Sequence, residues 1–148
     1  SGEVIPKMML RSMANQPIII FGDGTQTRDF LYVVDAARAI AQAGTAADVI
    51  GQTINLGSGS EVTIRQLARE IASVVGAKDP LIEHHPDRPG DVMRLCADTA
   101  KAKDLLSFQP HVSLPQGLRL LHEWYSRGER GPEEMLAEET IRNWEVVG

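Results

Sequence analysis

Glycine and proline divide this chain into short segments, and that division limits the length of every helix and strand. The 148 residues include 13 glycines and 8 prolines, and both residue types end or interrupt regular structure. Between these breaks, apolar residues recur either at helical spacing or in the short uninterrupted runs that are typical of strands. The sequence therefore predicts an α/β fold, a small mixed arrangement of short strands and several helices.

Two capping boxes indicate where helices begin. Thr63 is followed three residues later by Gln66, and an apolar stripe then runs to Gly76, so this box predicts a helix that a glycine ends. The segment Ser113 to Gln116 repeats the pattern with a proline in the first turn. We expect helices near 6–15, 36–42, 63–75, 98–106 and 114–126, with Asp35 and Asp98 at N-cap positions and Trp124 and Tyr125 facing inward.

Short apolar runs between turn residues predict the strands. The run from Ile18 to Phe21 is rich in β-branched residues and lies between Pro17 and the turn Gly22-Asp23-Gly24. We expect strands near 18–21, 52–56 and 92–96, and a further short one at 81–82. The predicted core contains Ile20, Leu31, Ile54, Leu67, Ile71, Leu118 and Leu121.

Composition limits the classes of partner. The net charge of −5 gives no general attraction to polyphosphates. Aromatic residues make up 5% of the chain and offer few rings on which bases could stack, so no nucleic-acid partner is expected. The chain has no stretch of about 18 apolar residues, so no membrane span is expected. A lone Cys96 predicts no internal disulfide and favours a reducing, cytoplasmic location.

Catalytic and metal motifs are incomplete. His84 and His85 are adjacent in a predicted strand, where their side chains point to opposite faces, so no metal site is predicted. Cys96 lies in an apolar segment and is expected to be an inert buried thiol. The turn Gly57-Ser58-Gly59 precedes Val62, where a dinucleotide-binding motif requires glycine, so we expect a plain turn and no cofactor site in this chain.

Motifs from Val4 to about Tyr125 nevertheless follow one another in a familiar order. They are Val4–Lys7, Ile18–Phe30, Tyr32–Asp35, Thr53–Gly59, Arg88–Val92, Ala97-Asp98, Lys101-Ala102, Pro110 and the helix 118–125. In this order they resemble the C-terminal lobe of extended short-chain dehydrogenases/reductases, the family of NAD-dependent nucleotide-sugar epimerases, dehydratases and decarboxylases. The resemblance implies a UDP-glucose 4-epimerase-like lobe that binds a UDP- or dTDP-sugar.

The motifs that such an enzyme needs for catalysis are absent from this sequence. Alanine stands four residues after Tyr32 and glutamate four residues after Tyr125, so the family's Tyr-x-x-x-Lys pair is missing together with its glycine-rich cofactor loop. The resemblance therefore implies half of an enzyme, in which NAD and the catalytic tyrosine belong to a missing N-terminal Rossmann domain. We expect no catalytic residue and no epimerase or dehydratase activity from this chain alone.

By the same resemblance, Arg28 and Arg88 bind the pyrophosphate of the nucleotide-sugar. A guanidinium group binds phosphate oxygens in pairs, which a lysine cannot do. The alternative, from the residues alone, is an ion pair or turn contact with a neighbouring aspartate, namely Asp23 or Asp29 for Arg28 and Asp87 or Asp91 for Arg88. If the arginines bind one pyrophosphate, they must line a common cleft with Phe21 and the start of the helix near Pro6.

The resemblance implies further substrate contacts, and each of these residues also has a purely structural explanation. Ile19 and Phe21 match the strand that contacts the base, although an apolar run of this kind is by default a core strand. Val4 and Pro6 match a segment beside the nucleotide, although an ordinary helix start explains them equally. Asn55 and Asp91 are weaker candidates, and Asn55 is as readily a turn residue that bonds to the backbone.

The last segment departs from the family pattern. We divide the chain into a nucleotide-sugar-binding lobe, 1–127, and an acidic C-terminal tail helix, 128–148, whose thin apolar stripe holds Leu136, Ile141 and Trp144. An appendage on the domain, a surface that packs on a partner and a solvated terminal helix are all open. The rival function is a non-enzymatic interaction or dimerisation module, because a lobe without its partner domain exposes an apolar face. Inward packing of the tail would favour that module.

Overall fold

The structure is a computed structural model that describes residues 4–137, 139, 141 and 144. Its helices are α1 (Val4–Met13), α2 (Val33–Ala43), α3 (Ile64–Val75), α4 (Ala100–Leu106), α5 (Leu114–Arg127) and α6 (Pro132–Leu136), with a 3-10 turn at Ala47–Val49. Its strands are β1 (Ile18–Phe21), β2 (Thr27–Arg28), β3 (Val62–Thr63), β4 (Ile82–His85) and β5 (Arg94–Leu95). The mixed α/β fold predicted from the sequence is confirmed.

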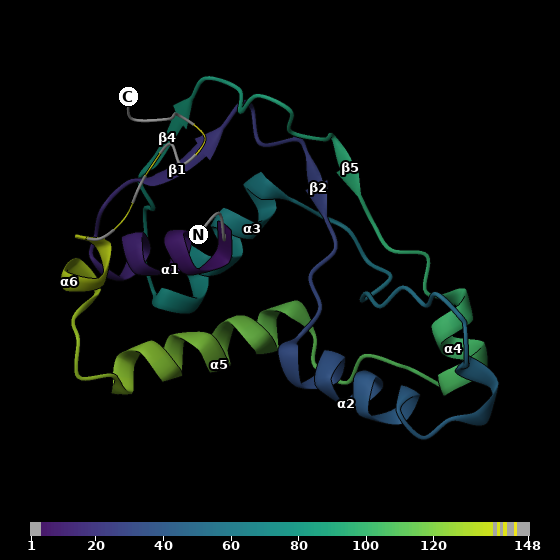
Figure 1. The fold of residues 1–148 in the computed structure, drawn as a ribbon. Coiled ribbons are helices and arrows are strands. Elements are labelled where there is room, and N and C mark those ends of the chain that lie inside the picture. The colour runs from purple at the N-terminus through teal and green to yellow at the C-terminus, as the bar shows by residue number, and fades with distance from the viewer. Residues whose placement is uncertain (1–3, 138, 140, 142–143, 145–148) are drawn as a thin grey trace.

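The strands form two small sheets. In the first, β1 and β4 are parallel, with Ile18 opposite Ile82. In the second, β2 lies in the middle, antiparallel to β3 and parallel to β5. Figure 1 shows β1 and β4 above α1 and α3, while β2 and β5 lead away toward α2 and α4. The molecule therefore has two regions that the second sheet and α5 connect.

The larger region packs α1, α3 and α5 against β1. Met9, Ile20, Leu67 and Ile71 are fully buried in it, and Leu118 from α5 is 1% exposed. Burial of these side chains removes the apolar stripes of three helices from water, which is the main favourable contribution to folding. We call this region the α1–α3 region.

The smaller region is centred on α2 and α4. Its buried cluster contains Ala39 from α2 together with Ala102, Leu106 and Phe108. The predicted core residues Leu31 and Ile54 are half-buried and pack against this cluster, and Leu121 packs in the same way against the larger one. We call this smaller part the α2–α4 region.

The first capping box is confirmed and the second is wrong. Thr63 accepts a hydrogen bond from the Gln66 amide while the Gln66 side chain accepts one from the Thr63 amide, and Gly76 ends α3 with φ 84°. The Ser113 side chain makes no capping hydrogen bond at α5. Pro115 explains part of this difference, because it removes one of the first-turn N–H groups that a cap would bind.

Other boundaries also differ from the predictions. Residues 52–56 form no strand, and only Arg94 and Leu95 of the 92–96 segment do. The first helix begins at Val4, before Pro6, and α2 begins at Val33, so Asp35 lies inside the first turn and is not its N-cap. Trp124 was predicted to face inward but is 66% exposed. The tail is helical only over Pro132–Leu136 among the described residues.

Candidate functional site

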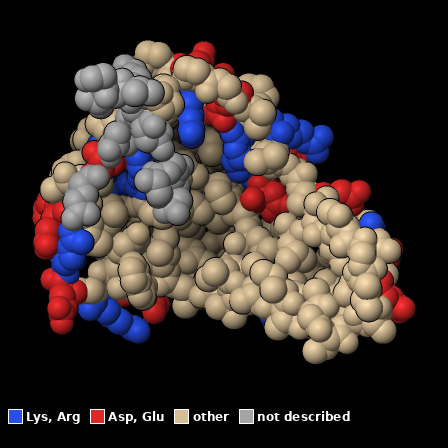
Figure 2. Space-filling view, in the orientation of Figure 1, with Lys and Arg blue, Asp and Glu red and all other residues tan. Residues whose placement is uncertain are grey.

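A cavity of about 220 Å³ lies where α1, β1 and the segment after β4 meet. Its walls include Val4 from α1, Ile19 and Phe21 from β1, and Arg28 from β2. Arg88 and Asp91, from the loop between β4 and β5, complete the wall opposite α1, and Glu139, Ile141 and Trp144 of the tail also line it. Figure 2 shows Lys and Arg side chains gathered on this part of the surface. The structure thus brings two arginines sixty residues apart to one hollow.

Arg28 is held at the cavity by the loop between β4 and β5. Its Nη1 atom donates hydrogen bonds to the carbonyl oxygens of Thr27 and Val92, at 2.7 and 2.8 Å, and its Nη2 atom forms an ion pair with Asp91. The pairing with Asp23 or Asp29 that the sequence left open is absent from the ion pairs of the described residues. Arg28 is therefore fixed in place, with 18% of its side chain exposed toward the hollow.

Arg88 and Phe21 both contact the tail. The Arg88 guanidinium lies over the Trp144 ring, 5.2 Å from its centroid. The Phe21 and Trp144 rings pack edge to face with centroids 4.8 Å apart, and His85 packs against Phe21 at 5.7 Å. Phe21 and Arg88, which belong to different elements, therefore meet one aromatic side chain.

Two cations on α1 were missed by the sequence reasoning. Lys7 and Arg11 line the cavity, and both form ion pairs with Glu139, at 3.8 and 2.7 Å. Their spacing from each other and from Val4 is the one that places residues on one helix face, so the sequence carried a signal for them. With Arg28 and Arg88, they give the cavity four positive side chains in a protein of net charge −5.

Two predicted site residues lie elsewhere. Pro6 belongs to α1 but does not line the cavity. Asn55 is exposed in the irregular segment before Gly57 and is also absent from the cavity wall. These two residues are therefore not brought together with the other predicted site residues, since Pro6 lies inside α1 and residues 52–56 join neither sheet, and their contact with substrate stays a prediction. The remaining predicted residues, Val4, Ile19, Phe21, Arg28, Arg88 and Asp91, all line it.

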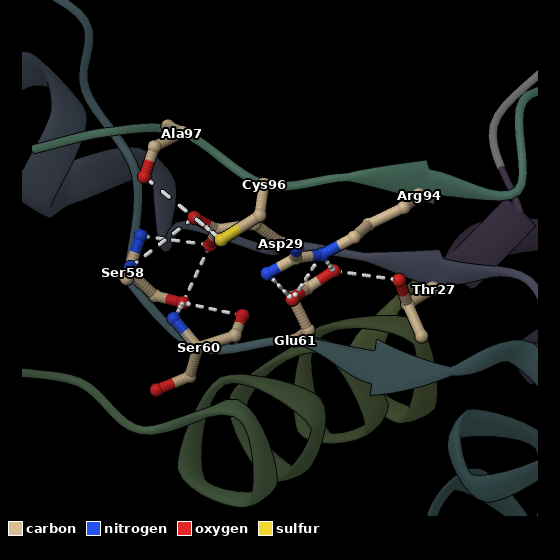
Figure 3. Close-up of polar contacts among 9 residues, drawn as sticks. Thr27, Asp29, Ser58, Ser60, Glu61, Arg94, Cys96 and Ala97 are labelled. Atoms are coloured by element: carbon tan, nitrogen blue, oxygen red, sulfur yellow. Dashed lines mark hydrogen bonds and ion pairs between the residues drawn. The ribbon is translucent and has the colours of Figure 1, made fainter.

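Asp29, the residue after β2, fixes the glycine turn. Its carboxylate accepts hydrogen bonds from the Ser58 amide at 2.7 Å, the Ser58 hydroxyl at 2.5 Å and the Gly59 amide at 3.1 Å (Figure 3). Gly57 permits this approach, because a Cβ atom there would lie 2.5 Å from the Asp29 carboxylate. Residues 57–59 form the turn that the sequence predicted, and hydrogen bonds to Asp29 also hold this turn against the end of β2.

Beside the turn of residues 57–59, Glu61 links β2 and β5 of the second sheet through hydrogen bonds. It accepts hydrogen bonds from the Thr27 hydroxyl at 2.6 Å and from the Arg94 guanidinium, as Figure 3 shows. The Arg94 and Thr27 hydrogen bonds hold the pKa of Glu61 below its usual value. Cys96 is exposed, which corrects the prediction of a buried thiol. Loss of hydration, followed by the Asp29 charge, raises its pKa, so the thiolate is disfavoured.

The described residues do not fit a dinucleotide cofactor. Such a cofactor needs free backbone N–H groups at a glycine turn that leads from a strand into a helix. The amides of Ser58 and Gly59 are already bonded to Asp29, and the turn at Gly22–Gly24 leads into β2 and not into a helix. Residues 4–137, 139, 141 and 144 also contain no cluster of His, Cys, Asp and Glu that could hold a metal ion.

Asp35 connects the two regions of the molecule. Its side chain is 1% exposed and accepts hydrogen bonds from the amides of His111 and Val112, at 2.9 and 3.0 Å, just before α5. Arg38 forms an ion pair with it at 2.9 Å. Burial alone would raise the pKa of Asp35, but the two amides and the Arg38 charge outweigh burial and lower it. Asp35 is therefore an ionised structural group outside the cavity.

Comparison with known proteins gives a family and solved relatives. The family model described as GDP-mannose 4,6 dehydratase matches residues 2–121. The chain is 40% identical to the UDP-glucose 4-epimerase of Mycolicibacterium smegmatis over 76% of its own length, and 35% identical to a dTDP-glucose 4,6-dehydratase of Neisseria gonorrhoeae over 83%. These matches span only 36% and 38% of the two relatives.

Solved structures show the same likeness. The UDP-glucose 4-epimerase of Thermotoga maritima, determined with UDP-glucose, superposes with a TM-score of 0.78 at 34% identity. The match covers 84% of this chain and 40% of that one. An epimerase from Methanothermobacter thermautotrophicus superposes with a TM-score of 0.80 at 35% identity, over 84% of this chain and 37% of that one. The described part of the chain contains no helix that is long and apolar enough to cross a membrane.

Proposed function

This chain belongs to the GDP-mannose 4,6 dehydratase family, and from that premise we propose that it is the nucleotide-sugar-binding lobe of an NAD-dependent epimerase or dehydratase. The observation that carries the proposal is the cavity that Arg28, Arg88 and Phe21 share. A nucleotide-sugar has two linked phosphates and a flat base. Its site therefore needs two guanidinium groups close together for the phosphates and an aromatic or apolar wall for the base. The relatives include one that was solved with UDP-glucose.

In this proposal, each cavity residue has a distinct role. Arg28 and Arg88 bind the diphosphate, and Asp91 orients Arg28 through their ion pair. Phe21 and Ile19 contact the base, while Val4 closes the α1 side. Lys7 and Arg11 add positive charge on the α1 wall, which attracts a dianion to a molecule that is acidic overall. The ligand is proposed as a UDP- or dTDP-sugar.

The complete reaction is proposed for a longer protein. NAD and a tyrosine base would come from a Rossmann domain N-terminal to this lobe, since the described residues fit no dinucleotide. The lobe would contribute to catalysis by holding the sugar carbon in position, and correct positioning lowers a barrier without any catalytic group in the lobe itself. A cytoplasmic location and the division into 1–127 and 128–148 remain part of this proposal.

A second candidate function is an interaction or dimerisation module. The observation in its favour is the apolar surface of α2, where Val33, Val34 and Ile40 are 57–70% exposed. A neighbouring hollow of about 200 Å³ between the segment 30–33 and α5 is lined mainly by apolar side chains. Surfaces of this kind mark protein contacts. In the first proposal the same surface packs against the Rossmann domain, whereas in the second it binds another protein or a second copy and the lobe takes no part in an enzyme.

Calorimetric titration with UDP and UDP-glucose tests the proposed function. We expect weak but saturable binding that Arg28→Ala weakens roughly 10- to 100-fold, because this substitution deletes a hydrogen-bonded cation at the phosphates. Arg119→Ala provides the matched control, since Arg119 is an exposed arginine on α5 outside the cavity. Equal titration curves for the wild type and Arg28→Ala would overturn the proposal.

A further inference from the structure

The tail beyond α6 makes its contacts with the same groups that the proposed function assigns to a nucleotide. Glu139 bonds to Arg11 and Lys7, and Trp144 packs against both Phe21 and Arg88. The side chains of Arg11 and Glu139 are only 11% and 9% exposed, so this ion pair is largely removed from water. The family model ends at residue 121, so Glu139 and Trp144 lie outside the matched segment while their partners lie inside it.

The chemical types of the tail side chains match parts of a nucleotide. A carboxylate on Arg11 and Lys7 supplies an anion to a cationic wall, as a phosphate would. An indole ring against Phe21 supplies an aromatic surface, as a base would, and the face of the same ring attracts the Arg88 guanidinium. Ile141 adds an apolar contact at the cavity wall.

The spacing of the two rings leaves no room for a base between Phe21 and Trp144. Stacking a base between two rings requires about 7 Å between them, because each contact is about 3.5 Å. The Phe21 and Trp144 centroids are 4.8 Å apart and the rings are nearly perpendicular, so the two rings already touch. The cavity of about 220 Å³ is also below the roughly 300 to 1,000 Å³ of small-molecule sites.

We propose that the tail is an internal competitor for the nucleotide site: Glu139 and Trp144 occupy it, and a nucleoside diphosphate must displace them to bind. This inference rests on the proposed function of the cavity. Displacement releases Arg88 from the indole ring and frees Phe21 to contact the base. The apparent affinity for ligand is then the intrinsic affinity multiplied by the fraction of molecules in which the tail is not seated.

Point variants of the tail test the competition, with UDP as the probe in calorimetry. Trp144→Ala is expected to bind UDP about five- to tenfold more tightly than the wild type, because the seated tail loses an aromatic pair and a cation–π contact. Glu139→Gln is expected to act in the same direction with a smaller effect. The matched controls are Trp124→Ala, a tryptophan that is 66% exposed on α5, and Glu134→Gln, whose carboxylate pairs with Arg130 outside the cavity.

A fluorescence measurement reports the displacement directly. In a Trp124→Phe background, Trp144 is the remaining tryptophan of the two in the sequence. Saturating UDP is expected to shift its emission to longer wavelength and to increase its quenching by acrylamide, because the ring leaves Phe21 for water. Unchanged emission and quenching at saturation would overturn the inference.

The outcomes separate this inference from the proposed function. If Trp144→Ala binds UDP equally or less tightly while Arg28→Ala still loses binding, Trp144 is no competitor and the nucleotide-sugar lobe stands. If the wild type, Trp144→Ala and Glu139→Gln all fail to bind UDP and UDP-glucose, the proposed function fails and the competition fails with it. Tighter binding by Trp144→Ala with unchanged controls supports both.

Discussion

The α1–α3 region and the α2–α4 region differ in how completely the chain covers their apolar residues. In the first, Met9, Ile20 and Leu67 are fully buried by helices and a strand on several sides. In the second, α2 buries Ala39 against α4 but leaves Val34 and Ile40 more than half exposed. The difference teaches that the first region covers its apolar residues within itself, whereas the second leaves an apolar face of α2 exposed to solvent.

Truncating one buried leucine in each region gives the largest expected effect. Leu67→Ala in α3 should lower the free energy of unfolding by about 3 to 4 kcal/mol, because it leaves a cavity in a fully packed core. Leu106→Ala in α4 should cost less, about 2 kcal/mol, since its smaller cluster can collapse around the gap. Urea denaturation measures both values. Equal losses would show that the two regions are equally well packed.

The next largest effect concerns binding and should be confined to one region. Arg28→Ala should weaken UDP binding roughly 10- to 100-fold, as expected for loss of hydrogen bonds to a charged group. Ile40→Ser on α2 should leave UDP binding unchanged, because this side chain lies outside the cavity. Calorimetric titration of both variants measures the contrast. A similar loss in Ile40→Ser would mean that the α2 face takes part in ligand binding.

Asp35 is the contact where the two regions can be separated. Asp35→Asn should lower the free energy of unfolding by about 1 to 3 kcal/mol, because the amides of His111 and Val112 lose a buried, charged acceptor. Thermal unfolding near neutral pH measures the loss. Asp29→Asn makes the comparable change at the glycine turn of residues 57–59, which precedes β3.

The Asp35 carboxylate makes the free energy of unfolding depend on pH, and the direction follows from its lowered pKa. The pKa of Asp35 is lowered in the folded protein, so its contribution to stability is fully present above the unfolded value of about 3.9. That contribution is lost as pH falls through the lower folded pKa. Unfolding midpoints between about pH 5 and 2 should therefore fall less steeply in Asp35→Asn than in the wild type. Parallel curves would contradict the assignment.

The smallest effect is expected on the exposed face of α2. Val34→Ser should change the free energy of unfolding by no more than about 0.5 kcal/mol, because surface substitutions away from packed features cost little. Val34 is 57% exposed in this chain. A loss several times larger would show that the face is already covered, for example by a second copy, and sedimentation at several concentrations would reveal that copy.

The sequence predicted best what depends on neighbouring residues. The capping box at Thr63, the stripe of α3 and the buried positions Ile20, Leu67, Ile71 and Leu118 are confirmed. All of these follow from local spacing, since one helix face or one short apolar run has a single way to avoid water. The family resemblance, which rests on motif order, is confirmed by the match over residues 2–121.

Features that depend on distant residues were not predictable in this way. Asp35 was expected to cap its own helix, but its partners are His111 and Val112, 76 and 77 residues away. The 52–56 segment has the composition of a strand but no neighbouring strand to pair with among the described residues. In the candidate site, the shared cavity was expected from the resemblance and inward packing of Trp144 was one of the alternatives for the tail, whereas the Glu139 ion pairs were not predicted.

The parallel pairing of β1 with β4 has a consequence for how the molecule folds. Ile18 pairs with Ile82, and Thr27 of β2 pairs with Arg94 of β5, in each case more than sixty residues along the chain. Contacts so distant in sequence close late, because the entropy of the intervening loop is lost before any hydrogen bond forms. During synthesis, the backbone groups of β1 (Ile-Ile-Ile-Phe) therefore stay unpaired until β4 has been made. We expect this interval to be the slow and aggregation-sensitive step in producing the protein.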